Sequence, residues 1–175
     1  LFISLEAKKI LQLDEIWWLV TPQNPLKISK PATYYERVKN CKTITQNYPI
    51  KIKEIEKKIY SDYSYKTINY ILKHYSNIKF FWLMGADNLI NFHMWQNWQK
   101  IFNNMSIVIF RRHGYNNKAL KSIAAQKFKN NRITKSVISS LDFDKTPSWS
   151  IIINKEIKIS STEIRGQRNK LRGSN

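Results

Sequence analysis

Residues 79–84 form an almost continuous apolar run that leads directly into Gly85, Ala86 and Asp87. A run of this kind predicts a strand that is covered on both faces, as the strands of parallel sheets are. A glycine and a carboxylate at the carboxyl end of such a strand lie where open α/β sheets bind nucleotides. We therefore expect a parallel sheet with a nucleotide site at its carboxyl edge.

Predicted helices and strands alternate along the chain, each identified by the spacing of its apolar residues. This alternation predicts an α/β fold with a parallel sheet and helices on both faces. A length of 175 residues fits one domain. Three prolines predict a loop over residues 21–31. The predicted helices are 4–13, 33–46, 64–75, 95–102, 118–128 and 161–171, and the predicted strands are 16–20, 50–55, 79–84, 106–110 and 148–153.

The chain is strongly basic, with 30 Lys and Arg against 12 Asp and Glu and a net charge of +18. Such a charge attracts polyanions, so a basic nucleic-acid-binding protein is one interpretation. The other is that the charge reflects a composition rich in Lys, Asn and Ile together with some phosphate ligands, because the basic residues are spread along the chain. We favour the second and expect no specific nucleic-acid partner, since no recognised nucleic-acid-binding motif is present.

Composition also bears on compartment and metal binding. No apolar run approaches the roughly 20 residues that span a bilayer, and the start of the chain does not predict a signal peptide. The single cysteine, Cys41, leaves no intrachain disulfide and is expected to be a small buried hydrophobic residue. These features suit the reducing cytoplasm and no membrane partner. His74, His93 and His113 lack the spacing of zinc ligands, so we expect no transition-metal site.

A second motif lies near the end of the chain, where Ser160, Ser161 and Thr162 precede Glu163 and Arg165. Hydroxyls at the start of a helix, with an arginine one turn later, suit phosphate. The Ser-x-x-Glu spacing equally fits a capping box with a surface arginine. From the residues alone, both interpretations stay open.

Several motifs, in order along the chain, resemble bacterial nicotinate-nucleotide adenylyltransferases, which belong to the nucleotidyltransferase superfamily and have a Rossmann-like fold. Two residues depart from the Tyr-Thr-x-Asp-Thr-Leu pattern of that family, since Ser64 replaces its Thr and Lys66 its Asp. The resemblance covers nearly the whole length and is carried by residues 13–20, 24–27, 63–68, 82–98 and 160–165.

The resemblance implies transfer of AMP from ATP, with Mg²⁺, to nicotinate mononucleotide, which gives deamido-NAD and pyrophosphate. In this reaction the protein acts mainly by positioning two phosphates and neutralising their charge. The substrates ATP and nicotinate mononucleotide are then the expected partners, and the oligomeric state is not predicted. The residues implied to bind ATP are Gly85, Asp87, Ser160, Ser161, Thr162 and Arg165.

For nicotinate mononucleotide, the resemblance implies contacts from Trp95, Ser64 and Lys27. Trp95 would stack on the pyridine ring, and Ser64 would help to present backbone N–H groups to the carboxylate. Arg37 is a further candidate for phosphate, and Arg111 and Arg112 are candidates for the adenine side.

Each of these residues has a plainer interpretation. Asp87 and Ser64 suit helix N-caps, Trp95 suits a core position, and Lys27 and Arg37 suit solvated surface charge. Three other functions also remain open: a nicotinamide-mononucleotide or phosphopantetheine adenylyltransferase, the basic nucleic-acid-binding protein above, and an inactive remnant.

Members of the family open with a strand, a Gly-Gly-x-Phe-Asp-Pro turn and a His-x-Gly-His motif. Aligned on the motifs above, Leu1 falls immediately after that histidine pair. We therefore expect residues 1–175 to be a single nucleotidyltransferase domain that is incomplete at its N-terminus. The first strand and the catalytic histidines would precede Leu1, and no catalytic residue is expected within the chain.

Overall fold

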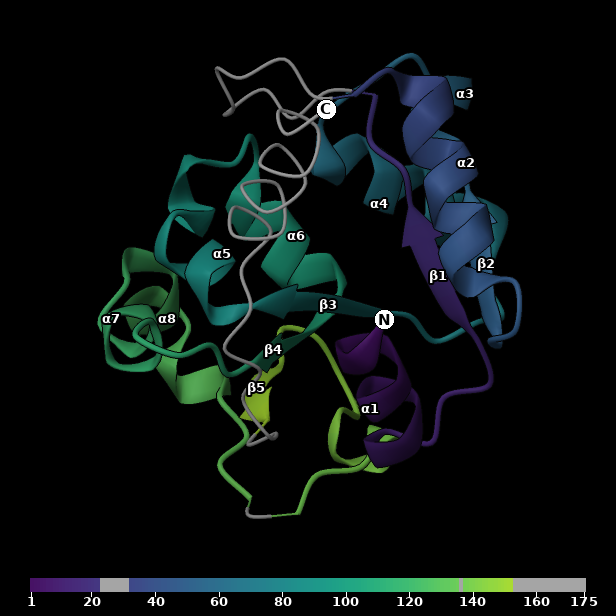
Figure 1. The fold of residues 1–175 in the computed structure, drawn as a ribbon. Helices are drawn as coiled ribbons and strands as arrows, with labels where there is room; N and C mark the ends of the chain where they lie inside the picture. The colour runs from purple at the N-terminus through teal and green to yellow at the C-terminus, as the bar shows by residue number, and fades with distance from the viewer. Residues whose placement is uncertain (23–31, 136, 153–175) are drawn as a thin grey trace, which may run out of the picture.

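The computed structural model describes residues 1–22, 32–135 and 137–152, whose strands form two parallel sheets flanked by helices (Figure 1). One sheet pairs β1 (Ile16–Leu19) with β2 (Ile50–Lys53). The other has the order β3 (Phe81–Gly85), β4 (Ser106–Phe110) and β5 (Trp149–Ile152). Every described pair is parallel, so the expected α/β class with helix-flanked parallel strands is confirmed.

The described helices connect these strands, and none of them is long and apolar enough to cross a membrane. The α-helices are α1 (Phe2–Ile10), α2 (Tyr34–Thr45), α3 (Ile55–Lys58), α4 (Ser64–His74), α5 (Ala86–Ile90), α6 (Trp98–Asn104), α7 (Asn116–Leu120) and α8 (Ile123–Lys127). The short 3₁₀ helices are η1 (Phe92–Met94), η2 (Lys129–Asn131) and η3 (Ser140–Asp142).

Strand β4 is the centre of the fold, because all five of its residues are buried. Side chains alternate between the faces of a strand, and here each face has its own apolar cluster. Ile107 and Ile109 pack in a cluster with residues of α5, α6 and α8. Val108 and Phe110 pack in a second cluster with residues of α1 and of β1 and β2. The two covered faces explain the continuous apolar sequence of this strand.

Three predicted boundaries are wrong for local reasons. The strand predicted over 50–55 ends at Lys53, and Ile55 begins α3. The helix predicted over 118–128 is two helices, because Ser122 caps α8 by accepting a hydrogen bond from the Ala125 N–H. The helix predicted over 95–102 begins only at Trp98, since Asn97 has a left-handed φ of 54°. The helix predicted over 161–171 lies outside the described residues.

Strands β1 and β3 each have one open edge within the described residues. Strand β1 pairs with β2 on one side only, and β3 pairs with β4 on one side only. Figure 1 shows β1 beside β2 and β3 beside β4, as two separate sheets. Unpaired edges present rows of N–H and C=O groups that are ready to pair with a further strand.

A buried hydroxyl pair gives a stability test of the second sheet. Ser106 and Ser148 are both buried, and their hydroxyls hydrogen-bond to each other at 2.9 Å. We expect Ser106→Ala or Ser148→Ala alone to lower the free energy of unfolding by about 1–3 kcal/mol, because each leaves one buried hydroxyl without its partner. The double alanine variant should lose less than the sum of the two. Denaturant melts of all four proteins measure this; additive losses would show that the pair is not coupled.

Candidate functional site

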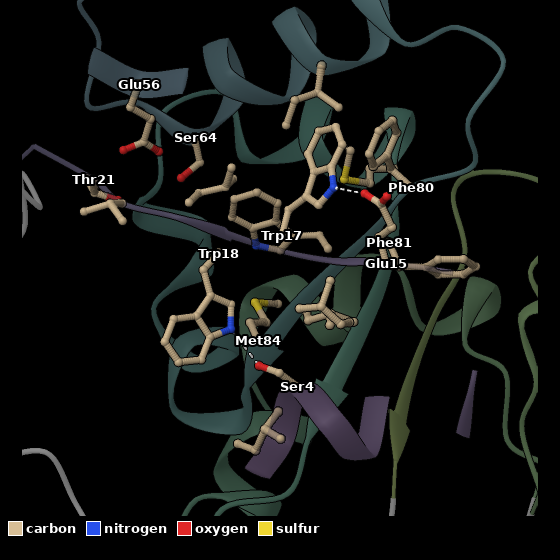
Figure 2. Close-up of a pocket in the computed structure, with 18 of the residues that line it drawn as sticks. Ser4, Glu15, Trp17, Trp18, Thr21, Glu56, Ser64, Phe80, Phe81 and Met84 are labelled. Atoms are coloured by element: carbon tan, nitrogen blue, oxygen red, sulfur yellow. Dashed lines mark hydrogen bonds between the residues drawn. The ribbon is translucent and has the colours of Figure 1, made fainter. Parts of the chain in front are cut away.

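A cleft of about 1380 Å³ separates the two sheets (Figure 2). Its walls include the consecutive residues 15–20 around β1 and 80–85 around β3. Consecutive residues of a strand point to opposite faces, so a cleft that they all line runs along the strand edges. The cleft therefore follows the two open edges and ends where the carboxyl ends of β1 and β3 lie.

The amino end of the cleft is aromatic. The Trp17 ring makes edge contacts with Tyr75 at 5.0 Å and Phe80 at 5.2 Å between ring centroids. The ammonium group of Lys53 lies 4.1 Å from the centroid of the same ring. Further along, the Trp18 indole N–H donates to the Ser4 hydroxyl at 2.8 Å, which ties α1 to β1. These contacts bind α1, β1 and β3 around the cleft.

The carboxyl end of the cleft carries polar side chains from three elements. Thr21 follows β1, Glu56 lies on α3 and Ser64 is the first residue of α4. Figure 2 shows these three residues, here called the polar corner, grouped at one end of the cleft. They give the cleft a place where hydrogen-bonding groups of a ligand are accommodated.

Glu56 is the most buried member of the polar corner, with 3% of its surface exposed. The Thr67 hydroxyl donates to its Oε1 at 3.3 Å, whereas its Oε2 has no hydrogen-bond partner among the described residues. Burial raises the pKa of the carboxyl, and hydrogen bonds from Thr21 and Thr67 offset part of that rise. The sequence did not single out Glu56, because it lies among alternating charged residues that are also typical of a solvated face.

Arg37 donates hydrogen bonds to backbone carbonyls at both ends of the segment that follows β1. Its guanidinium donates to the backbone carbonyls of Thr21 and Pro22 on one side, and its Nε donates to the carbonyl of Ala32 at 3.1 Å on the other. The plainer interpretation of Arg37 as a solvated surface charge is therefore wrong. A phosphate contact from Arg37 stays a prediction.

The residues after β3 and β4 form an ion pair at the carboxyl edge of the second sheet. Asp87 Oδ2 lies 2.5 Å from Arg112 Nη1, and both side chains are partly exposed. Gly85 is the N-cap of α5 and Asp87 lies in its first turn, so the interpretation of Asp87 as the N-cap is wrong. A Cβ on Gly85 would stand 2.5 Å from Asp87 Oδ1, so the glycine makes room for this carboxylate.

Trp95 and Ser64 both line the cleft. The Trp95 ring is half-buried and packs on Phe92 at 4.8 Å and on the edge of Trp82 at 6.4 Å between centroids. One part of the indole thus rests on the core and another reaches the cleft. Ser64 is not an N-cap, because Tyr63 holds that position and makes no side-chain cap bond.

The structure thus gathers part of the predicted site. Gly85, Trp95, Ser64 and Arg37 line one cleft, and Asp87 pairs with Arg112 beside it. Arg111 instead lines a separate hollow of about 260 Å³ that also includes Arg132 and Lys135. Five predicted residues lie outside the described part of the chain: Lys27, Ser160, Ser161, Thr162 and Arg165.

Two further predictions concern metal and cysteine. In residues 1–22, 32–135 and 137–152, no three His, Cys, Asp or Glu side chains come together as metal ligands. Cys41 is only half-buried and lines the cleft, so its expected place in the core is wrong. Burial still raises the pKa of its thiol.

Comparison with known proteins identifies relatives over nearly the whole chain. The family model described as cytidylyltransferase-like matches residues 1–167. A probable nicotinate-nucleotide adenylyltransferase of Ruegeria is 37% identical over 163 residues, which are 93% of this chain and 86% of that protein. The protein of the same name from Rhizobium meliloti is 35% identical over 95% of this chain and 89% of its own length.

Solved structures support the same fold. Nicotinic acid mononucleotide adenylyltransferase of Plasmodium falciparum, complexed with APC, matches with a TM-score of 0.66 at 16% identity, over 94% of this chain and 74% of that one. The same enzyme complexed with NaAD matches with a TM-score of 0.63 at 18% identity, over 93% of this chain and 74% of that one. At these identities the similarity shows the fold.

Gly85→Ala tests the packing of the Asp87 carboxylate. We expect the added Cβ to push Asp87 away from Arg112 and to lower the free energy of unfolding by about 1–3 kcal/mol, the range for overpacking. In an Asp87→Ala background the same substitution should be close to neutral, because the clashing oxygen is gone. Melts of the two singles and the double measure this; an equal loss in both backgrounds would contradict the role given to Gly85.

Proposed function

The chain belongs to the cytidylyltransferase-like family, and we propose that within it the chain is a nicotinate-nucleotide adenylyltransferase. The enzyme transfers the adenylyl group of ATP to nicotinate mononucleotide in the synthesis of pyridine nucleotides. The observation that carries the proposal is that one cleft, at the carboxyl ends of parallel strands, is lined by Gly85, Trp95 and Ser64. The similarity to relatives of that name over 93% and 95% of the chain supports it.

The reaction joins two nucleotides without a covalent enzyme intermediate. An oxygen of the mononucleotide 5′-phosphate attacks the α-phosphorus of ATP. The bond from that phosphorus to the bridging oxygen of the β-phosphate breaks, and pyrophosphate leaves with the electron pair. Such transfers depend on positioning and on stabilising charge rather than on a protein nucleophile.

The described residues divide between the two substrates. Asp87 accepts hydrogen bonds from the ATP ribose, as carboxylates after strands do in nucleotide-binding folds, and Arg112 orients Asp87 while facing the adenine side. Arg111 lines the separate hollow and is given no contact with ATP. Trp95 stacks on the pyridine ring. The α4 N-terminus at Ser64 presents free backbone N–H groups to the nicotinate carboxylate.

The remaining proposed contacts are to phosphate. Ser160, Ser161, Thr162 and Arg165 hold the triphosphate of ATP, and Lys27 binds the mononucleotide. Arg37, which donates to the backbone carbonyls of Thr21 and Ala32, is a further candidate for phosphate. Mg²⁺ bound to the ATP phosphates would neutralise part of their charge.

The first strand expected for this family has a matching space in the structure. Strands β1 and β3 both leave an edge unpaired, and the cleft runs along both edges. A parallel strand between them joins the two sheets into one and leaves the polar corner and Trp95 accessible at the carboxyl end. We propose that a further parallel strand pairs with these two edges.

A direct assay tests the function. Full-length protein, ATP and Mg²⁺ are incubated with nicotinate mononucleotide or with its amide, and pyrophosphate release is followed. We expect turnover with the acid and a clearly lower kcat/KM with the amide. Equal or better use of the amide identifies the nicotinamide-mononucleotide enzyme instead, and no turnover with either rejects the proposal.

Trp95→Ala is expected to weaken the binding of nicotinate mononucleotide about 2- to 12-fold while changing the KM of ATP little, because a stacked aromatic pair contributes about 0.5–1.5 kcal/mol beyond area burial. Steady-state kinetics with each substrate varied measures this. Trp98→Phe is the matched control, since Trp98 packs on Phe102 and Phe128 in the core. Equal losses for both substrates would remove Trp95 from the pyridine site.

Arg165→Ala is expected to raise the KM of ATP and to lower turnover, with little change in melting temperature. A charge-assisted hydrogen bond to phosphate contributes about 1.5–3 kcal/mol. Kinetics and thermal melts of the same preparation decide. A large drop in melting temperature with unchanged ATP kinetics would mean that the arginine serves the fold.

A further inference from the structure

Glu56 is a buried acid that has no role in the reaction described above. It is 3% exposed, and within the described chain its Oε2 lacks a hydrogen-bond partner. Buried polar oxygens without a partner are rare in native structures, and each one calls for an explanation such as a ligand or water. Its place in the polar corner, next to Ser64, makes a ligand the simplest one (Figure 2).

The carboxyl group is held in a fixed orientation. Thr67, on the first turns of α4, donates to Oε1 at 3.3 Å, and Thr21 lies with Glu56 in the polar corner. Because α3 and α4 are both packed in this region, Oε2 keeps its direction before a ligand arrives. An acceptor that is already oriented binds its donor without a further loss of conformational entropy.

We propose that Glu56 accepts a hydrogen bond from a ribose hydroxyl of the mononucleotide. The inference rests on the function proposed above and adds a residue that determines how the sugar is recognised. It follows from the donors that each part of this substrate has. The pyridine acid carries no N–H or O–H donor at neutral pH, and the phosphate offers mainly acceptors, so the two ribose hydroxyls are the donors that match Oε2.

The charge around Glu56 is compatible with an anionic substrate. Burial raises the pKa of the carboxyl, and the nearby Asp62 raises it further, while Arg37 and the two threonine hydroxyls oppose the rise. A raised pKa favours the uncharged form and so limits repulsion of a nearby nicotinate carboxylate. Either form of Glu56 keeps an oxygen that accepts from a hydroxyl.

The test combines substitutions of Glu56 with analogues of nicotinate mononucleotide that lack one ribose hydroxyl. Dissociation constants of nicotinate mononucleotide and of its 2′-deoxy and 3′-deoxy analogues are measured with the full-length wild-type protein, Glu56→Gln and Glu56→Leu. We expect wild type to bind one of the deoxy analogues about 10- to 100-fold more weakly, the range for a hydrogen bond to a carboxylate. Glu56→Leu should bind the parent ligand as weakly and should no longer distinguish it from that analogue.

Two variants, Glu54→Gln and Glu56→Gln, keep the result of this test interpretable. Glu54→Gln is the matched control, because Glu54 accepts from the Tyr34 hydroxyl at 3.0 Å and does not line the cleft; it should discriminate like wild type. If Glu56→Leu does not fold, the near-isosteric Glu56→Gln carries the test, with a reduced preference for the hydroxyl expected.

The possible outcomes separate the two proposals. Equal binding of all three ligands by wild type, or unchanged discrimination by the Glu56 variants, overturns the role of Glu56 while the adenylyltransferase stands. If wild type binds none of the three ligands, the proposed function itself has failed.

Discussion

The parallel register of β3 with β4 determines how the residues after these two strands lie at the carboxyl edge of the second sheet. Gly85 pairs with Phe110, so the chains leave the sheet side by side. Asp87 and Arg112 each lie two residues beyond this pair, and their side chains meet at 2.5 Å. Because β4 is buried on both faces, this register is difficult to shift: a slip of one residue would exchange the contents of two apolar clusters. The core thus fixes the geometry of the edge.

The cleft depends on polar contacts that reach across element boundaries. Arg37 on α2 holds the carbonyls at both ends of the segment that follows β1. Glu56 on α3 is held by Thr67 on α4. These contacts join helices and strand ends around one end of an apolar cleft, where a substrate with a flat ring and charged groups finds both kinds of surface. The geometry therefore supports nucleotide binding independently of the similarity to relatives.

Much of this fold could be predicted from sequence because apolar spacing reports burial directly. The run before Gly85 and the run of β4 both form parallel strands. Only β4 is buried throughout; in β3 only Met84 is buried, so the prediction that the run before Gly85 is covered on both faces is wrong within the described residues. The boundaries failed where one residue decided them, as with Ser122 between α7 and α8 and the left-handed Asn97 before α6. Motifs identified Trp95 and Ser64 as lining residues of the cleft. Glu56 could not be predicted, because only tertiary packing distinguishes a buried glutamate from its solvated neighbours. The backbone carbonyls that Arg37 binds could not be predicted either, because they are contacts of the folded chain.

The central claim is that the carboxyl end of the cleft between β1 and β3 binds the mononucleotide. A crystal structure of the full-length protein with nicotinate mononucleotide tests it most directly. The account predicts density for the pyridine ring against Trp95, with the nicotinate carboxylate at the N-terminus of α4. Well-ordered ligand elsewhere, for example in the hollow beside Arg111 and Arg132, with Trp95 and Ser64 untouched, would contradict it.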